Sequence, residues 1–401
     1  GGQRTRRGTR AGRGRGGVST AADLMAGRAT RAGTEEYTRT RGRACAEGHY
    51  SDFLNLHLKL SSLGIGTFGG AATDAVDAGY AAVVERALLN GVNVVDTATH
   101  YRYGRSARAA GAGLKAAVAR GVRRDQVFLV SKGGFLLFPD GPPHDPQAWF
   151  QREIAERGLG RREDLTGVHL LSPEHLDWQI DRSREALGVE TLDAFLVDQP
   201  EVHIPVIGKA AVNQKLERCF VTLERAVRDG RIGCYGLATF NGLRVETDHP
   251  LFESIASLQG HAQKAAQEVW GDANAKHALR VVALPFNQVM LEGFTRFSQA
   301  TGQGNVASTI QAAHQLRVYV LASHALAKGH LASQCVDGVY AALPQLANHA
   351  QRSLQFNRST PGLGTSLVGV STASHLDDVL AVAQLPPLAR AAYLQMYQRA
   401  T

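Results

Sequence analysis

The sequence predicts a (β/α)8 barrel with two long loop insertions and a basic N-terminal extension. Eight short apolar runs, rich in β-branched residues, alternate with amphipathic helical patterns. At 401 residues the chain can hold a barrel of about 250 residues plus insertions. Polar and ionisable residues follow several of the apolar runs directly, and the carboxyl ends of its strands are where a barrel keeps its chemistry. These three observations define the fold class.

The elements follow from periodicity along the chain. Strands are predicted at 60–66, 92–96, 127–131, 192–197, 232–237, 280–284, 317–321 and 366–370. Helices are predicted at 73–90, 106–120, 173–187, 212–229, 302–315 and 343–357.

Two longer segments interrupt the alternation. The first, 135–171, contains Pro139, Pro142, Pro143 and Pro146 and follows Lys132 directly. The second, 241–279, follows the fifth strand. Loops of this length at the carboxyl face of a barrel usually shape specificity or bind partners.

A dinucleotide-binding sheet is the competing fold. Gly64, Gly66 and Gly69 match its Gly-x-Gly-x-x-Gly fingerprint ahead of a helix. The acid that ends the next strand, Asp96, lies 27 residues past Gly69, however, and the expected spacing is about 20. Eight alternating units also exceed the six of a doubly wound sheet, so the spacing and the repeat number both favour the barrel.

The N-terminal segment has its own composition. Residues 1–43 hold eleven arginines and three acidic residues, which accounts for the whole formal net charge of +8. Such an Arg/Gly-rich segment is expected to be disordered by itself. We therefore divide the chain into an extension, 1–52, and a barrel, 53–401.

Three roles fit this segment. Its guanidinium groups are suited to RNA or an acidic protein partner, and the candidate contacts are Arg4, Arg6, Arg7, Arg10, Arg13 and Arg15. It also fits a remnant of an organelle-targeting sequence, with a mitochondrion favoured over a plastid. A solvated tail on a cytoplasmic protein is the third alternative.

Composition argues against other classes of protein. No apolar run approaches the roughly 20 residues of a membrane helix, so no membrane span is expected. Cys45, Cys219, Cys234 and Cys335 are single and widely spaced, which argues against a disulfide framework or a structural zinc site. His169 and His203 have no paired ligands nearby, so we assign no metal and expect them to be hydrogen-bonded or solvated.

Three ionisable residues at successive strand ends can form an acid catalyst. Asp96 ends the second predicted strand, Tyr101 follows it by five residues, and Lys132 follows the third strand. A tyrosine has an unperturbed pKa of about 10, and a neighbouring ammonium favours its phenolate. We predict Tyr101 as the acid, Lys132 as the group that tunes its pKa, and Asp96 as the anchor of Lys132.

The motif Asp-Thr-Ala-x-x-Tyr at 96–101, followed by Ser-Lys-Gly-Gly at 131–134, resembles the aldo-keto reductase family. The resemblance extends over roughly residues 60 to 385 through further segments at 63–68, 229–236, 284–287 and 367–371. It implies a TIM barrel and an NADP(H)-dependent oxidoreductase that reduces a small carbonyl substrate. It also implies cofactor contacts from Thr67, Thr239, Ser323, Ser371, His375 and Asp378.

The chain departs from the family pattern at several of these positions. Asp198 stands where the family has a histidine that ends the fourth strand, and a carboxylate there would repel a developing alkoxide unless burial kept it protonated. Ala283 replaces a glutamine that holds the nicotinamide carboxamide. Further replacements lie at Ala238 and Thr239, where relatives have Ser-Asn, at Ser323 for a tyrosine, at His375 for an arginine that pairs with the 2′-phosphate, and at Asp378-Val379 for Glu-Asn.

Two functions are therefore open. The first is an NADPH-dependent reductase in which Tyr101 supplies the proton. The second is a pseudoenzyme that has lost the cofactor and serves as a structural subunit of a large ribonucleoprotein, such as an organellar ribosome, anchored by its arginine tail. Asp96, Tyr101 and Lys132 would then only hold the barrel mouth together.

Overall fold

The computed structural model describes residues 24–53, 56–302 and 304–398. Its centre is a closed barrel of eight parallel strands in the order β10-β13-β14-β3-β4-β5-β8-β9. All eight predicted strands are confirmed, and the closed barrel excludes the dinucleotide-binding sheet. The barrel strands are β3 (Leu63–Gly66), β4 (Val94–Asp96), β5 (Phe128–Gly133), β8 (Leu192–Asp198), β9 (Ile232–Ala238), β10 (Leu279–Pro285), β13 (Tyr319–Ser323) and β14 (Thr365–Gly369).

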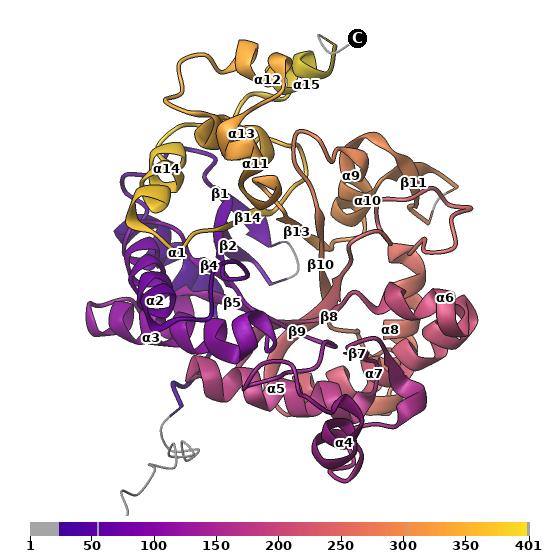
Figure 1. Ribbon diagram of the computed structural model, residues 1–401. Helices are drawn as coiled ribbons and strands as arrows, with labels where there is room; N and C mark the ends of the chain where they lie inside the picture. The colour runs from indigo at the N-terminus through magenta and orange to yellow at the C-terminus, as the bar shows by residue number, and fades with distance from the viewer. Residues whose placement is uncertain (1–23, 54–55, 303, 399–401) are drawn as a thin grey trace, which may run out of the picture.

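Helices surround the barrel, as Figure 1 shows. The larger ones are α2 (Asp74–Leu89), α3 (Arg105–Ala119), α5 (Pro173–Leu187), α7 (Lys209–Arg228), α8 (Ile255–Trp270), α13 (His349–Arg358) and α14 (Ala373–Ala383). Shorter ones are α4 (Pro146–Phe150), α6 (Ile204–Ile207), α9 (Glu292–Thr295), α10 (Thr309–Gln315), α11 (His330–Ser333), α12 (Asp337–Ala342) and α15 (Arg390–Gln398).

Two helix predictions and one loop prediction need correction. The helix expected at 302–315 begins only at Thr309, because the residues before it form β12 (Val306–Ser308), which pairs with β11 (Phe297–Ala300). The helix expected at 343–357 begins at His349, where the Asn348 side chain caps it. The segment 241–279 is not all loop. It contains α8, whose buried residues Ile255, Leu258, Ala262, Ala265 and Ala266 have the spacing of one helical face.

The first insertion is an excursion with its own small core. It contains α4, one π-helical turn at Gln151–Ala155 and the two-stranded sheet of β6 (Leu165–Thr166) and β7 (His169–Leu170). Its buried apolar residues are Leu136, Phe150, Ile154, Leu159 and Leu170. This satellite core holds the excursion against the barrel without a long helix.

The N-terminal residues that are described correct the prediction of disorder over 1–43. Helix α1 (Arg31–Thr40) begins at the Thr30 cap, and the fully buried Tyr37 donates from its hydroxyl to the Leu88 carbonyl at 2.7 Å. The Ala29 amide donates to Asp193 Oδ1 at 2.7 Å, and the same carboxylate pairs with the buried Arg124 at 2.7 Å. The first 23 residues, including Arg4, Arg6, Arg7, Arg10, Arg13 and Arg15, lie outside the described part of the chain.

The strand predicted at 60–66 is two strands. β1 (Tyr50–Phe53) and β2 (Leu58–Ser61) form an antiparallel hairpin, and only β3 belongs to the barrel. Phe53 stacks on Tyr319 with ring centroids 4.9 Å apart and lies 5.6 Å from the Phe128 ring. Because these rings belong to the apolar cluster inside the barrel, the hairpin closes its amino end.

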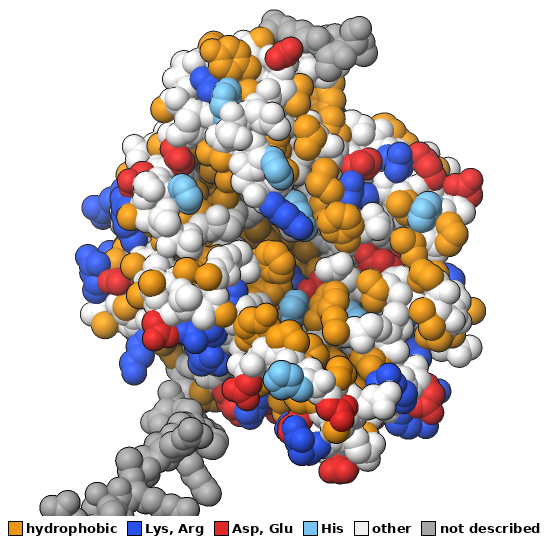
Figure 2. All heavy atoms as spheres, in the orientation of Figure 1, with side chains coloured by type: hydrophobic (Ala, Val, Ile, Leu, Met, Phe, Trp, Pro, Cys, Tyr) orange, Lys and Arg blue, Asp and Glu red, His pale blue; other side chains and the backbone are white. Residues whose placement is uncertain are grey.

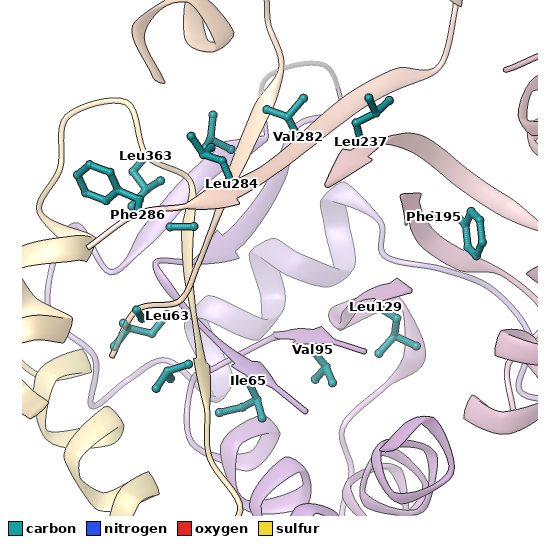
Figure 3. Packing of buried hydrophobic residues seen from close by; sticks show 14 of the residues in the cluster. Leu63, Ile65, Val95, Leu129, Phe195, Leu237, Val282, Leu284, Phe286 and Leu363 are labelled. Carbon is teal, nitrogen blue, oxygen red and sulfur yellow. The ribbon is translucent and has the colours of Figure 1, made fainter. Parts of the chain in front are cut away.

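Strand alternation sorts the core into two layers. Leu63, Ile65, Val95 and Leu129 point outward and pack against the helices, as Figure 3 shows. Val94, Phe128, Val130, Ala194 and Leu196 belong to the inner cluster. Since side chains two residues apart share a face, Asp96, Lys132 and Asp198 continue the inner rows at the carboxyl end of the barrel.

The four cysteines are free thiols. In the described part of the chain, no helix combines the length and the apolar character that a bilayer crossing requires.

Candidate active site at the carboxyl end of the barrel

The end of the barrel opposite the hairpin carries the predicted ionisable residues. In the orientation of Figure 1, the space-filling view shows a hollow over the middle of the barrel, bordered by hydrophobic and histidine side chains (Figure 2). Asp96 ends β4, Lys132 lies near the end of β5, and Asp198 ends β8. All three side chains are buried.

Lys132 joins the other two predicted members of the site. Its Nζ donates to the Asp96 Oδ1 and Oδ2 atoms at 2.5 and 2.6 Å, to the Thr97 carbonyl at 3.1 Å, and to the Tyr101 hydroxyl at 3.2 Å. It also lies 5.0 Å from the centroid of the Tyr101 ring. Burial alone would lower the pKa of the Lys132 ammonium, but the negative charges around it, of which Asp96 is the largest, outweigh burial and raise that pKa. Lys132 therefore stays charged, as predicted.

The predicted effect on Tyr101 needs correction. Lys132 does favour the phenolate, but burial and the charges of Asp96 and Asp198 outweigh it, so the pKa of Tyr101 is raised above its usual 10. Tyr101 is consequently a neutral phenol whose hydroxyl lies against an ammonium. Such a group holds its proton in the resting site, and the ammonium stabilises the phenolate that proton donation leaves behind.

Asp198 meets the condition set by its position, which is that burial keeps its carboxyl protonated. Burial raises the pKa of its carboxyl to about 7, although the Lys132 charge opposes the shift. Its one hydrogen bond to a described side chain is a long one, 3.5 Å from Gln199 Nε2 to Oδ1. A large fraction of Asp198 is therefore neutral at pH 7, and a neutral carboxyl donates a hydrogen bond instead of repelling an alkoxide.

A chain of two histidines lies behind Asp198. His169 Nε2 contacts the Asp198 carbonyl at 2.6 Å, His169 Nδ1 contacts His203 Nε2 at 2.9 Å, and His203 Nδ1 contacts Thr166 Oγ1 at 2.9 Å. Burial lowers the pKa of His169 to about 3 and that of His203 to about 4, so both rings are neutral. The carbonyl can only accept. His169 must therefore donate from Nε2 and accept at Nδ1 from His203, which in turn accepts from Thr166.

This chain confirms that His169 and His203 are hydrogen-bonded and not solvated. It also fixes the β6–β7 hairpin of the first insertion to the end of β8. The sequence gives no sign of the link, because the two histidines belong to different loops.

The predicted cofactor residues fall into two groups. Thr67, Thr239 and Ser323 lie at or just beyond the ends of β3, β9 and β13. The Thr67 hydroxyl donates to the Asp96 carbonyl at 3.1 Å, and Ser323 Oγ lies 3.0 Å from His324 Nδ1. Ala283 is buried inside the barrel, and its carbonyl accepts from the Thr239 amide at 2.9 Å.

The second group surrounds the start of α14. Ser371 and His375 flank Thr372, which caps the helix, and the first-turn amides of a helix suit a phosphate. His375 is exposed. Asp378 Oδ1 instead accepts from Asn348 Nδ2 at 2.7 Å and from Gln351 Nε2 at 2.9 Å, so it holds the start of α13. The strand-end hydroxyls and the α14 amides fit a phosphorylated nucleotide. Ala283, however, offers no side-chain partner to the carboxamide of a nicotinamide.

Two residues of the Tyr101 loop were not predicted from the sequence. His100 packs edge-on against Tyr101, with ring centroids 4.9 Å apart. Arg102 is buried, donates to the Ala71 carbonyl at 2.7 Å and pairs with Asp77 at 2.7 Å. Arg102 and Tyr103 have φ values of 50° and 59°, and these contacts compensate the unfavourable left-handed backbone. His100 and Arg102 are the sequence neighbours of Tyr101, and this adjacency was the signal that could have identified them.

The first insertion lies beside this loop. Together with α3 and α5 it encloses a cavity of about 900 Å³, whose lining includes Thr99, Gly104, Leu137, Trp149 and Trp178. Thr99 and Gly104 flank Tyr101 in the chain, so the insertion contacts the outer side of the site loop. No group of three or more potential metal ligands gathers within the described residues.

Comparison with known proteins agrees with this geometry. The model of the aldo/keto reductase family matches residues 62–259. No curated protein matches the chain in sequence. Three similar solved structures are an aldo/keto reductase from Klebsiella pneumoniae in complex with NADP and acetate, an aldo-keto reductase from Bacillus halodurans in its holo form, and a thermostable aldo-keto reductase in complex with the inhibitor epalrestat.

The likeness extends over most of each chain. For these three structures in turn, sequence identity is 16%, 14% and 15%, and the TM-score is 0.56, 0.56 and 0.55. The matches cover 86%, 87% and 87% of this chain and 92%, 95% and 98% of those chains. At such identities the likeness shows a shared fold.

Proposed function

This chain belongs to the aldo/keto reductase family, and we propose that it is an NADP(H)-dependent reductase of a small aldehyde or ketone. One observation carries the proposal: a buried Lys132 ammonium lies between the Asp96 carboxylate and the Tyr101 hydroxyl at the carboxyl end of the barrel. A barrel needs no such arrangement to fold, because a buried ion pair contributes little net stability. The arrangement is, however, what proton donation by a phenol requires.

The residues divide the work as follows. Tyr101 donates its proton to the carbonyl oxygen as that oxygen becomes an alkoxide, and Lys132 stabilises the phenolate that remains. Asp96 holds Lys132 in place. Asp198, when neutral, donates a second hydrogen bond near the oxygen. NADPH, when bound, supplies the hydride. Thr67, Thr239, Ser323, Ser371 and His375 are the residues suited to hold it.

A second function rests on the altered cofactor positions. Asp378 is bound to Asn348 and Gln351, and Ala283 offers no side-chain hydrogen bond. Both observations favour a weakened grip on the cofactor. We therefore also propose a catalytically inactive reductase-fold subunit, held by its arginine-rich tail in a ribonucleoprotein such as a mitochondrial ribosome.

A fluorescence titration with NADPH separates the two proposals. The natural chain is compared with a double variant in which Asp198→His and Ala283→Gln restore the family residues. Micromolar binding by the natural chain supports the reductase. Binding by the double variant alone contradicts it and supports cofactor loss.

The subunit proposal has a test of its own. A subunit anchored to RNA leaves its complex as salt rises, because each phosphate contact releases counterions. The full chain and a chain that begins at residue 24 are sedimented with RNA over a salt series. Equal behaviour of the two chains would exclude the arginine tail as the anchor.

A further inference from the structure

His100 contacts Tyr101, the proposed proton donor, without a hydrogen bond to it. Its ring lies edge-on to Tyr101 at 4.9 Å and tilted against Phe135 at 4.9 Å. Phe68 also packs edge-on against Tyr101 at 5.0 Å, and it is 62% exposed. The His100 ring is thus fixed by aromatic contacts at the barrel mouth.

The two nitrogens of His100 differ in their surroundings. Nδ1 is buried and hydrogen-bonds no atom of the described residues. Nε2 likewise makes no hydrogen bond to the described residues, and the His100 residue as a whole is partly exposed at the barrel mouth. A proton on a buried, unpartnered nitrogen would be costly, so the ring carries its proton on Nε2. The structure therefore presents a neutral ring with one accessible N–H.

Two buried histidines, His49 and His169, have a partner at each ring nitrogen, whereas the buried His175 has a partner at Nδ1 alone. The buried His49 contacts the Gly91 carbonyl at 3.0 Å through Nε2 and Ser62 Oγ at 3.2 Å through Nδ1. In His100, by contrast, the accessible N–H remains available to a ligand.

We propose that His100 Nε2 donates a hydrogen bond to the carbonyl oxygen of the substrate, beside the Tyr101 hydroxyl that protonates it. This role rests on the proposed reductase function and adds a contact residue to it. His100 keeps its proton throughout, since the proton that the alkoxide receives comes from Tyr101. Its effect is to stabilise the charge that develops on that oxygen.

The charges around His100 favour a neutral donor. Burial and, as the smaller cause, the Lys132 ammonium together lower the pKa of His100 to about 3. Lys132 already supplies one positive charge, which Asp96 balances. A neutral N–H stabilises an oxyanion without placing a second positive charge in the mouth.

Two substitutions test the role. His100→Phe keeps a ring between Tyr101 and Phe135 but removes the N–H, and His100→Gln restores an N–H on a smaller side chain. With benzaldehyde as the probe, His100→Phe is expected to lower kcat/KM about 10²-fold, the typical loss for one oxyanion donor. His100→Gln recovers part of that loss. NADPH affinity and near-ultraviolet circular dichroism remain as in the natural chain.

A spectroscopic readout makes the test independent of turnover. In the ¹⁵N-histidine spectrum, the His100 signals are identified by their loss in His100→Phe. Nδ1 is expected to be unprotonated, and added benzaldehyde shifts the protonated Nε2. A shift in a natural chain that neither binds NADPH nor reduces benzaldehyde would defeat the reductase proposal but support carbonyl binding by His100. An absent shift, or an unchanged kcat/KM in His100→Phe, overturns the role.

Discussion

Lys132 Nζ lies within 2.6 Å of both carboxylate oxygens of Asp96, at a place where neither side chain has much access to solvent. The two residues come from neighbouring strands, β4 and β5, whose register brings their carboxyl ends together. The pair fixes an ammonium 3.2 Å from the Tyr101 hydroxyl. The ion pair therefore holds the Lys132 ammonium and the Tyr101 hydroxyl in a single arrangement.

Tyr101→Phe is the most direct test of proton donation. We expect carbonyl reduction to fall by about 10²- to 10⁴-fold, because only the donating hydroxyl is lost. The ring still packs against His100 and Phe68, so thermal stability and NADPH affinity remain as in the natural chain. Single-turnover reduction of benzaldehyde measures the effect. Equal activity would remove Tyr101 from the mechanism.

Lys132→Met is expected to abolish activity and to destabilise the fold. Removing one partner of a buried ion pair typically costs about 3–5 kcal/mol, because the other charge is left uncompensated. The double variant Lys132→Met with Asp96→Asn leaves no charge behind and should regain most of that stability while staying inactive. Urea denaturation of the two variants measures the difference. Equal stability of both would show that the pair is not coupled in the fold.

The raised pKa of Asp198 predicts that activity depends on pH. Its carboxyl has a pKa of about 7 and faces Lys132, Asp96, Tyr101 and Glu201, so it is neutral below pH 7 and ionises above it. Activity that needs the neutral acid is therefore present below about pH 7 and lost as pH rises through it. Asp198→Asn stays neutral at every pH, and its kcat/KM profile should lack this step. A step retained in Asp198→Asn would assign it to another group.

The same shift predicts an effect on stability. The usual pKa of this carboxyl is 3.8, but in the folded chain it is about 7. Between pH 3.8 and pH 7 the Asp198 carboxyl therefore holds its proton in the folded chain but has lost it in the unfolded chain. The free energy of unfolding should then fall as pH rises across this window. Asp198→Asn should remove that slope, so it stabilises the protein more at pH 8 than at pH 5. Chemical denaturation at the two pH values decides the point.

His169→Phe tests the histidine chain behind the site. The substitution leaves the Asp198 carbonyl and the His203 N–H without their partners, and each buried unpaired group costs about 1–3 kcal/mol. Hydrogen exchange should quicken in the 135–171 insertion, which the chain fixes to β8. The exposed His375 provides a control, since His375→Phe should leave exchange in this segment unchanged. Unaltered exchange in His169→Phe would mean that the satellite core alone holds the insertion.

Asp193→Ala tests the attachment of the N-terminal segment. Asp193 accepts from the Ala29 amide and pairs with the buried Arg124, so its loss strands a charge and should cost about 3–5 kcal/mol. Cleavage by protease near residues 24–30 should also become faster. The exposed pair of Arg86 and Asp377 gives a matched control, because Asp377→Ala should change stability by less than about 1 kcal/mol. Slow cleavage in Asp193→Ala would locate the attachment in α1.

The sequence was informative where a local pattern determines structure. The β-branched runs predicted all eight barrel strands, and the motifs at 96–101 and 131–134 predicted the contacts among Asp96, Lys132 and Tyr101. The hairpin was missed because Ser61 and Ser62 separate β2 from β3 without a glycine or proline. Helix α1 was missed because arginine and glycine dominate its flanks.

Properties that depend on packing were harder to predict. Burial and the charges of Asp96 and Asp198 raise the pKa of Tyr101, whereas Lys132 lowers it, and only Lys132 was considered from the sequence as the group that tunes this pKa. His169 reaches the end of β8 because an insertion folds back, and no spacing in the chain encodes that approach. The roles of Ser371, His375 and Asp378 remain predictions.

Met25 bridges Val189 just before β8 begins. That point lies at the amino end of the barrel, together with the hairpin, whereas Tyr101 and His100 lie at the other end. A molecule that contacted Met25 and the hairpin would therefore be engaged from the amino end of the barrel. Immobilisation on an assembly and free diffusion of a small carbonyl compound into the mouth are sterically compatible, so tethering this protein need not silence it.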